Sequence, residues 1–199
     1  DALRRMGFRD PEGAIEILNK LAKPGERPPL PADLFRELIE SPDPDMALSN
    51  FERLVMAAVS PASFFHTLEA DPRACHVLIH ILGGSQFLSD ILVRDPQYFY
   101  WLTETSDRLV DVPGRVDLLA EFEAGIARFG STRARLNALR RFNRKELLRL
   151  GAGDLVGERP IEDVAQGLSD LADACLQTLL NVLTTEMEAN YGSPKNQDG

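Results

Sequence analysis

Helix-start signals recur along the chain and constrain its fold more than any other feature. At Asp10, Ser60, Asp71 and Asp95, an Asp or Ser is followed directly by Pro. The first residue of such a pair caps the free backbone amides of a helix, and Pro occupies the first helical position, where no N–H is needed. β-branched residues are sparse and never alternate at period two, so nothing favours strands. The sequence therefore predicts an all-α fold.

The helix signals predict a multi-helix bundle of short helices with one long helix near the C-terminus. The expected helices cover residues 10–23, 32–40, 45–59, 61–69, 71–82, 85–94, 95–104, 115–129, 132–150 and 160–190. Breaks fall in a Pro-rich connector at 23–31, at Val112-Pro113-Gly114 and in the Gly-rich stretch 151–160. We expect a helical subdomain over 1–112, a long-helix subdomain over 113–191 and a flexible tail over 192–199.

Apolar residues follow one another in steps of three and four along the last predicted helix. They are Val164, Leu168, Leu171, Cys175, Leu179, Val182 and Leu183. This spacing places them on one face of a helix, and we expect that face to be covered by other elements. We read the aromatic residues in a similar way, as core material: Phe51, Phe64, Phe65, Phe87, Tyr98, Phe99, Tyr100 and Trp101.

Composition limits where the protein works. No apolar run approaches the roughly 18 residues of a membrane span, and no secretory signal peptide opens the chain. Cys75 and Cys175 belong to no C-x-x-C motif, which excludes a zinc ribbon and a dithiol redox site. We expect two buried thiols, no contact with a membrane, and a cytoplasmic protein. Because the chain begins with Asp1 rather than Met, we expect a piece of a longer protein.

The net charge of -9 hides an uneven distribution. Residues 128–149 hold eight basic residues and one acid, Glu146, or +7, so the remainder carries -16. An acidic body repels nucleic acid, which makes nucleic acid an improbable partner; if residues 128–149 did bind it, affinity would fall steeply with salt. A basic helix on such a body favours a docking surface.

The basic helix provides the candidate site residues: Arg133, Arg140, Arg141, Arg144 and Lys145. Their spacing of i, i+7, i+8, i+11 and i+12 predicts that they cluster on one side of a helix. Guanidinium groups suit two-point contacts with carboxylates or phosphates. We therefore interpret these residues as a partner or phosphate contact. The alternative is a solvated face with ordinary intramolecular ion pairs.

Several short patterns imitate chemical sites. Gly83-Gly84-Ser85 followed by Asp90 resembles a nucleotide-binding turn, but the flanks read as helix, so we expect the glycines to end one helix and Ser85 to cap the next. Asp170 and Asp173 share a helix face, where we expect solvent or ion pairs rather than a metal.

His76 and His80 lie four residues apart, a spacing that places two imidazoles on one zinc ion in some proteins. The sequence offers no obvious third ligand beyond Glu69 or Asp71. We expect hydrogen-bonded, partly buried histidines, and we assign no catalytic, cofactor-binding or metal-binding residue to the chain.

Three stretches, taken in their order and spacing, resemble the glutamate–ammonia-ligase adenylyltransferase family. They are ILGGSQFLSDILVRDPQYFYWL at 81–102, LRRFNRKELLRLGAGDL at 139–155, and LSDLADAC at 168–175. The opening residues 6–11 also look like the start of that family's helical region. The family attaches AMP to glutamine synthetase and, in two-domain members, also removes it.

In that family a helical segment precedes a nucleotidyltransferase domain of the DNA polymerase beta superfamily. A Gly-rich turn and a Ser-Asp-x-Asp motif there hold Mg²⁺ on the ATP phosphates. This chain has no G-x-G-K-x-G-G, and its nearest Asp-x-Asp, at Asp43 and Asp45, lies in a Pro-flanked turn.

The resemblance therefore implies a non-catalytic helical segment, with Mg²⁺ and ATP used elsewhere in the full-length enzyme. It implies as partners the protein's own nucleotidyltransferase domain, glutamine synthetase and a nitrogen-signalling regulatory protein. The alternative is a free-standing helical interaction module with no enzymatic activity.

Overall fold

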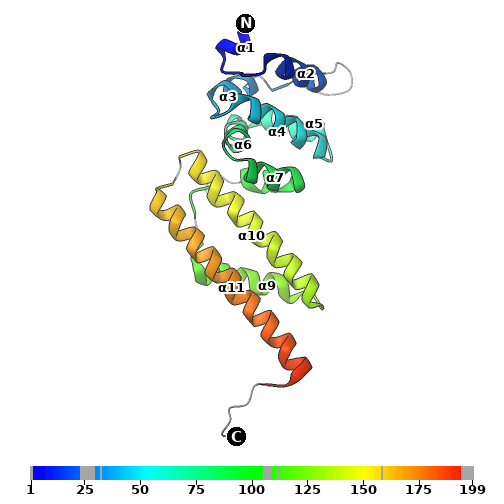
Figure 1. Ribbon diagram of the computed structural model, residues 1–199, viewed down its shortest axis with the longest axis vertical. Coiled ribbons are helices and arrows are strands. Elements are labelled where there is room, and N and C mark those ends of the chain that lie inside the picture. Colours follow the sequence, from blue (N-terminus) through cyan, green and yellow to red (C-terminus); the bar gives the residue numbers. More distant parts are fainter. Residues whose placement is uncertain are drawn as a thin grey trace. The chain divides into compact units, whose positions relative to one another are not determined.

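The structure, a computed structural model, describes residues 2–22, 30–31, 33–104, 109–111, 113–157 and 159–193. These residues form eleven α-helices and no β-strand, which confirms the predicted all-α fold (Figure 1). None of the described helices is long and apolar enough to span a membrane.

The chain divides into two compact units. Unit 1 comprises Asp1–Val110 and Gly151–Glu158, and unit 2 comprises Asp111–Leu150 and Arg159–Gly199. The expected subdomain boundary at residue 112 and the expected tail over 192–199 stay predictions. Residues 23–29 of the connector, residue 112 and residues 194–199 lie outside the described part of the chain.

Unit 1 contains the short helices. They are α1 (Ala2–Arg5), α2 (Pro11–Leu21), α3 (Leu34–Glu40), α4 (Pro44–Ala57), α5 (Pro61–Ala70), α6 (Pro72–Gly84), α7 (Gln86–Arg94) and α8 (Gln97–Thr103). The sequence patterns do not predict α1, whose four residues bury no side chain. Helices α4 and α6 make the most extensive packing in this unit, and α3, α5 and α7 also pack against them.

A phenylalanine cluster forms much of the core of unit 1. Phe51, Phe64, Phe65 and Phe99 are fully buried, and the rings of Phe64 and Phe99 meet edge to face with centroids 5.1 Å apart. These residues confirm the expectation that aromatics build the core. For Phe87 the expectation was wrong, because its side chain is 59% exposed on α7.

The helix-start signals have a clear structural basis. The side chains of Asp10, Ser60 and Asp71 each accept a hydrogen bond from a backbone N–H two or three residues further on. At Asp95 the prediction was wrong, because α8 begins at Gln97 and Asp95 contributes only its backbone carbonyl, to the N–H of Tyr98. A further pair, Asp43-Pro44, starts α4 instead of forming the expected turn.

Glycines behave differently at two expected helix ends. Helix α6 ends at Gly84, and the Ser85 hydroxyl caps α7 by accepting from the N–H of Leu88, as predicted. The break expected over 151–160 starts later than predicted, because α10 (Thr132–Leu155) continues through Gly151 and the next helix begins at Ile161. A Cβ at Gly151 would lie 2.6 Å from Leu88 Cδ1, so this glycine allows close packing within unit 1 rather than a chain break.

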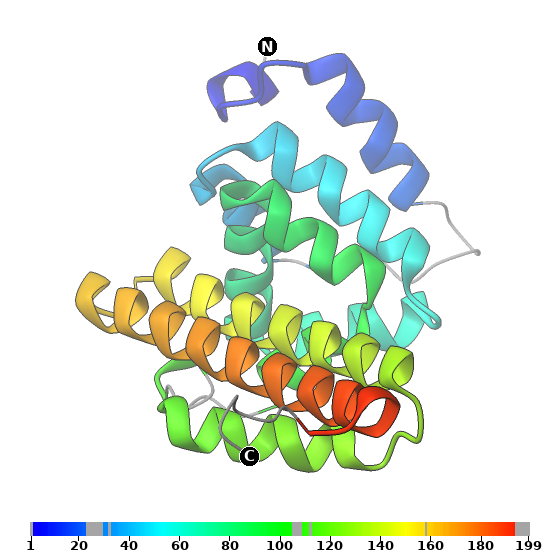
Figure 2. The same ribbon diagram turned by 60° about the horizontal axis from the view of Figure 1, so that its bottom comes forward.

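Unit 2 consists of α9 (Arg115–Ala127), α10 up to Leu150, and α11 (Ile161–Tyr191). Helices α10 and α11 run side by side in both views (Figures 1 and 2), and α9 packs along α11. Phe122 of α9 stacks on Phe142 of α10 with ring centroids 5.8 Å apart. Leu171 and Ala174 of α11 complete this core.

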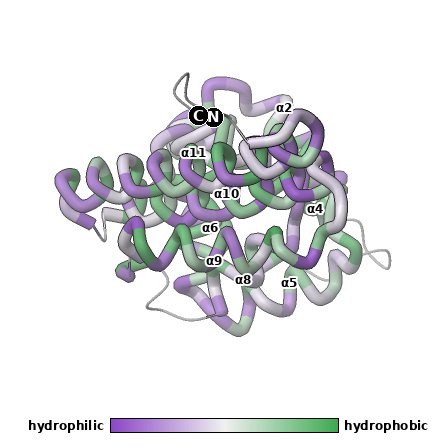
Figure 3. Tube along the Cα trace, turned by 90° about the horizontal axis from the view of Figure 1, so that it is seen from below, coloured by the Kyte–Doolittle hydropathy of each residue, from purple (hydrophilic) through white to green (hydrophobic). Residues whose placement is uncertain are grey.

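Hydrophobic and hydrophilic residues alternate in bands along the helices (Figure 3), as in amphipathic helices. On α11 the predicted stripe is only partly covered. Val164, Leu171 and Val182 are buried, whereas Leu168 and Leu183 are 43% and 37% exposed. The uncovered apolar residues continue with Leu176 and Leu180, each more than half exposed.

We predict that Asp43→Ala lowers the free energy of unfolding of unit 1 by about 1 kcal/mol, because α4 loses its cap. The Asp43 carboxylate accepts from the N–H of Met46 at 3.1 Å and forms an ion pair with Arg9. The matched control is Asp95→Ala, which removes no side-chain cap and should change stability by less than about 0.5 kcal/mol. Chemical denaturation followed by circular dichroism measures both; equal losses would contradict the prediction.

The stability difference between the wild type and Asp43→Ala should also depend on pH. Burial alone raises the pKa of Asp43, but the hydrogen bond from Met46 and the Arg9 guanidinium lower it by more, so its pKa lies below the ordinary value. A depressed carboxyl pKa contributes stability above the unfolded pKa of about 3.9, and this contribution is lost as pH falls through the lower folded pKa. The gap between wild type and Asp43→Ala should therefore narrow below about pH 4.

Candidate functional site

The five basic residues predicted as one cluster divide into two groups on α10. Arg133, Arg140 and Arg144 follow at i, i+7 and i+11 and share a narrow face of the helix, here called the basic edge. Arg141 and Lys145 lie further round the helix, toward other parts of unit 2. The structure thus keeps three of the five residues together.

Contacts within unit 2 occupy the second group. The guanidinium carbon of Arg141 lies 5.9 Å from the centroid of the Phe129 ring, within cation–π range. Lys145 Nζ lies 3.9 Å from Glu121 Oε1 on α9. These two cations therefore match the alternative interpretation, in which basic side chains serve intramolecular contacts.

The basic edge is more open. Arg133 and Arg140 are exposed, and Arg144 is half-buried. Arg140 Nη1 donates to Asn137 Oδ1 at 3.0 Å, a neutral partner one turn away. Within the described part of the chain, no carboxylate forms an ion pair with Arg133, Arg140 or Arg144. Three cations are thus left to interact with something else.

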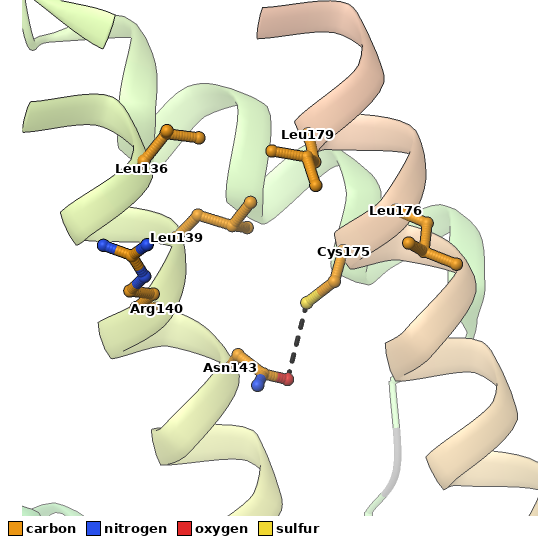
Figure 4. Close-up of a pocket in the computed structure, with 7 residues that line it drawn as sticks. All are labelled: Leu136, Leu139, Arg140, Asn143, Cys175, Leu176 and Leu179. Atoms are coloured by element: carbon orange, nitrogen blue, oxygen red, sulfur yellow. Dashed lines mark hydrogen bonds between the residues drawn. The ribbon is translucent and has the colours of Figure 1, made fainter. Parts of the chain in front are cut away.

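A pocket of about 220 Å³ lies beside the basic edge, between α10 and α11. Figure 4 shows its lining, which is Leu136, Leu139, Arg140 and Asn143 from α10 and Cys175, Leu176 and Leu179 from α11. The lining is apolar apart from Arg140 and the Asn143 amide. Pockets for small molecules usually measure about 300–1,000 Å³, so this one suits a side chain or two of a partner better than a nucleotide.

Cys175 does not add a reactive group to the pocket. Its Sγ donates to Asn143 Oδ1 at 3.4 Å, and burial raises the pKa of the thiol to about 11. Burial, and next the carboxylates of Glu37 and Asp33, raise the pKa of Cys75 to about 12. Because the thiolate is the nucleophile, neither cysteine is activated for chemistry at neutral pH.

A buried charged group anchors the C-terminal half of α10, and sequence reasoning missed it. Glu146 and Arg149 form an ion pair although each is about 5% exposed or less. Arg149 and Arg159 both donate to the backbone carbonyl of Asp111, at 2.6 and 2.9 Å. Burial raises the pKa of Glu146, and the charge of Arg149 opposes that rise. The spacing of Glu146 and Arg149 was visible in the sequence, but their burial was not.

The acidic patterns do not form a nucleotide site. Ser89 is fully buried and its hydroxyl donates to the Ser85 carbonyl, while Asp90 pairs with Arg53 at 2.8 Å. Asp170 accepts from Gln166, and Asp173 lies 3.6 Å from Arg115. Every one of these carboxylates sits on a helix beside a protein partner. These two patterns therefore lack the strand-flanked turn and adjacent acids of the nucleotide site that they imitate.

The two helical histidines acquire a third neighbour that the sequence did not suggest. His76 Nδ1 lies 2.8 Å from Glu37 Oε2, and Glu37 belongs to α3 rather than to the segment around Glu69 or Asp71. Burial alone raises the pKa of Glu37, but hydrogen bonds from Arg36 and His76 lower it by more, so the carboxyl pKa lies below its ordinary value. Packing of α3 on α6 creates this contact, and no local pattern encodes it.

We predict that Glu146→Ala lowers the free energy of unfolding of unit 2 by about 3–5 kcal/mol, because it leaves the Arg149 cation buried without its carboxylate. Glu121→Ala on α9 removes the exposed pairing partner of Lys145 and should cost less than about 1 kcal/mol. Guanidinium denaturation of both variants measures the difference. Losses of similar, small size would show that the Glu146–Arg149 pair behaves as a surface ion pair.

Comparison with known proteins links this geometry to a family. Residues 75–199 match the sequence model described as glutamate-ammonia ligase adenylyltransferase. That match contains all three helices of unit 2, and with them the basic edge and the α10–α11 pocket. No solved structure matches the chain significantly.

Relatives with the same name extend the similarity over nearly the whole chain. A bifunctional glutamine synthetase adenylyltransferase/adenylyl-removing enzyme from Mycobacterium marinum is 28% identical over 200 residues, covering 96% of this chain and 20% of the relative. Its namesake from Leifsonia xyli subsp. xyli is 32% identical over 91% of this chain and 18% of the relative. The namesake from Corynebacterium glutamicum is 26% identical over 98% and 19%.

The chain spans about a fifth of the length of these curated relatives. The match of the family's sequence model covers more than half of the chain, and the relatives that share the name agree with it. The chain therefore belongs to the glutamate-ammonia ligase adenylyltransferase family.

Proposed function

We propose that this chain is a non-catalytic helical segment of a glutamine synthetase adenylyltransferase/adenylyl-removing enzyme. The full protein transfers AMP from ATP to a tyrosine hydroxyl of glutamine synthetase, or removes it, and so regulates nitrogen assimilation. Membership of the family and the name shared by the relatives support this proposal. Mg²⁺ and ATP serve the nucleotidyltransferase domain of the longer protein, and the carboxylates of the two imitating patterns are held by Arg53 and Arg115 instead.

The segment itself acts as a docking surface in the cytoplasm. The observation that carries this role is the apolar α10–α11 pocket, which Arg140 lines, together with the basic edge, whose three arginines no described carboxylate neutralises. An apolar pocket beside the basic edge favours a partner segment that presents an apolar side chain next to carboxylates. The charge of -16 outside residues 128–149 disfavours nucleic acid as the partner.

Glutamine synthetase is the partner that we propose for this surface. The relatives' names identify it as the protein on which they act. The chain's own nucleotidyltransferase domain and a nitrogen-signalling regulatory protein are the further partners that the family implies. The unpaired arginines make the surface sensitive to salt, because exposed charges are screened beyond about 8 Å at physiological ionic strength.

A binding experiment tests the docking role. The 199-residue chain is immobilised, and binding of unmodified glutamine synthetase from the same organism is measured by interferometry at low and moderate salt. We predict that Arg133→Glu/Arg140→Glu weakens binding by at least about tenfold, or about 1.4 kcal/mol. Leu176→Asp, which places a charge at the pocket, should weaken binding as well.

Two matched controls separate local from general effects. Arg4→Glu/Arg5→Glu reverses the same number of charges on exposed residues of α1, and Val116→Asp places a charge at a 75% exposed residue of α9. Both controls should bind as the wild type does. Controls that weaken binding as much as the site variants would contradict the docking role. If the chain does not bind glutamine synthetase at all, the alternative of a free-standing interaction module is favoured.

A labelling assay tests the non-catalytic role independently. The chain is incubated with glutamine synthetase, Mg²⁺ and ATP labelled at the α-phosphate, beside a longer family member as positive control. We expect label on glutamine synthetase only with the longer protein. Incorporation catalysed by this chain alone would place an active site inside it and refute the proposal.

A further inference from the structure

Three side chains of unit 1 form a group that the proposed docking role does not use. Glu37 of α3 and His76 and His80 of α6 each direct one potential ligand atom into a space where these atoms lie within 4.8 Å of one another. The imidazole rings of His76 and His80 are close together, with centroids 4.0 Å apart. Among the described residues, this is the group of His, Cys, Asp and Glu side chains whose arrangement suits a metal ion.

A set of two His and one Glu is one that catalytic zinc sites use, with a water molecule as fourth ligand. Two imidazole nitrogens and one carboxylate oxygen bind Zn²⁺ at about 2.0–2.2 Å, which places the ligand atoms roughly 3.3 Å from one another. Glu37 Oε2 and His76 Nδ1 are already 2.8 Å apart. The His80 ligand atom lies within 4.8 Å of both, so metal binding requires it to approach them by roughly 1.5 Å or less.

Hydrogen bonds around the group hold the ligands in orientation. His80 Nδ1 lies 3.0 Å from the backbone carbonyl of His76, which leaves Nε2 as the metal-facing nitrogen. Arg36 donates to Glu37 Oε1 at 2.9 Å, which leaves Oε2 toward the histidines. Outer contacts of this kind accompany most histidine and carboxylate ligands and fix their tautomer and direction.

Burial and charge both favour a bound cation. Glu37 is 3% exposed, so its carboxylate is removed from water and gains from a strong partner. Arg36 is already neutralised by Asp33 at 3.0 Å, and Glu40 adds a further negative charge nearby. Carboxylates thus outnumber guanidinium groups around the site. The His76 side chain is 41% exposed, which provides an entry path and room for a water molecule as fourth ligand.

We infer that Glu37, His76 and His80 form a binding site for one Zn²⁺ ion, which links α3 to α6. In the metal-free chain, a direct hydrogen bond joins His76 of α6 to Glu37 of α3 instead. Binding would stabilise unit 1, because an ion that binds the folded chain shifts the unfolding equilibrium by mass action. The site lies in unit 1, so the docking proposal for unit 2 stands or falls separately.

The third histidine supplies a matched control. The chain contains three histidines, and His66 on α5 is exposed and outside the group. The tag-free chain is stripped of metal with a chelator and titrated with ZnCl₂ by calorimetry. Substitution by Co²⁺, followed through its visible absorption, reports the coordination of the ion.

We expect one Zn²⁺ per chain, visible Co²⁺ bands typical of four or five ligands, and a higher melting temperature with metal. His80→Ala and Glu37→Gln should each weaken Zn²⁺ binding by more than the roughly 10–100-fold that loss of an outer contact costs. His66→Ala should bind as tightly as the wild type. Far-UV circular dichroism confirms that each variant stays helical, and His80→Ala is the decisive variant because His80 is only half-buried.

Two results would overturn the inference. One is a loss of Zn²⁺ affinity of less than tenfold in a His80→Ala variant that is folded. The other is an equal loss of affinity in His66→Ala, which would indicate non-specific binding to surface imidazoles. Either result would leave Glu37 and His76 as a purely structural hydrogen-bonded pair.

Discussion

Both units of this structure depend on helices that each bury one apolar face. Helices α2 to α9 contain 7–14 residues, and helices of this length are marginal on their own in water. In unit 1 the phenylalanine cluster supplies the buried face, and in unit 2 the stack of Phe122 on Phe142 does. The candidate site inherits this constraint: because the opposite side of α10 is held in the core, the basic edge is held toward solvent.

Local chemistry was predictable from sequence where a side chain acts on its own turn. Asp10, Ser60 and Asp71 cap their helices because the acceptor and the free N–H lie within three residues. Prediction failed where packing decides. Gly151 reads as a break, yet α10 continues because Leu88 requires a residue without a side chain there. The sequence pattern assigns Phe87 to the core, yet it is 59% exposed.

The candidate site shows the same division. Helical spacing placed Arg133, Arg140 and Arg144 on one face, but it also grouped Arg141 and Lys145 with them. Only the positions of Phe129 and Glu121, fixed by the folding of unit 2, show that these two cations have local partners. Glu37 illustrates the larger gap: it lies 39 residues from His76, and nothing in the sequence announces that α3 packs on α6.

The two thiols have a practical consequence. Cys75 lies in unit 1 and Cys175 in unit 2, and burial keeps both protonated at neutral pH. An alkylating reagent reacts with the thiolate, so each cysteine stays unmodified until the helices around it transiently open. Pulse labelling with mass spectrometry would then measure the rate of local opening in each unit separately. Each unit has one native cysteine as its reporter, so no engineered probe is needed.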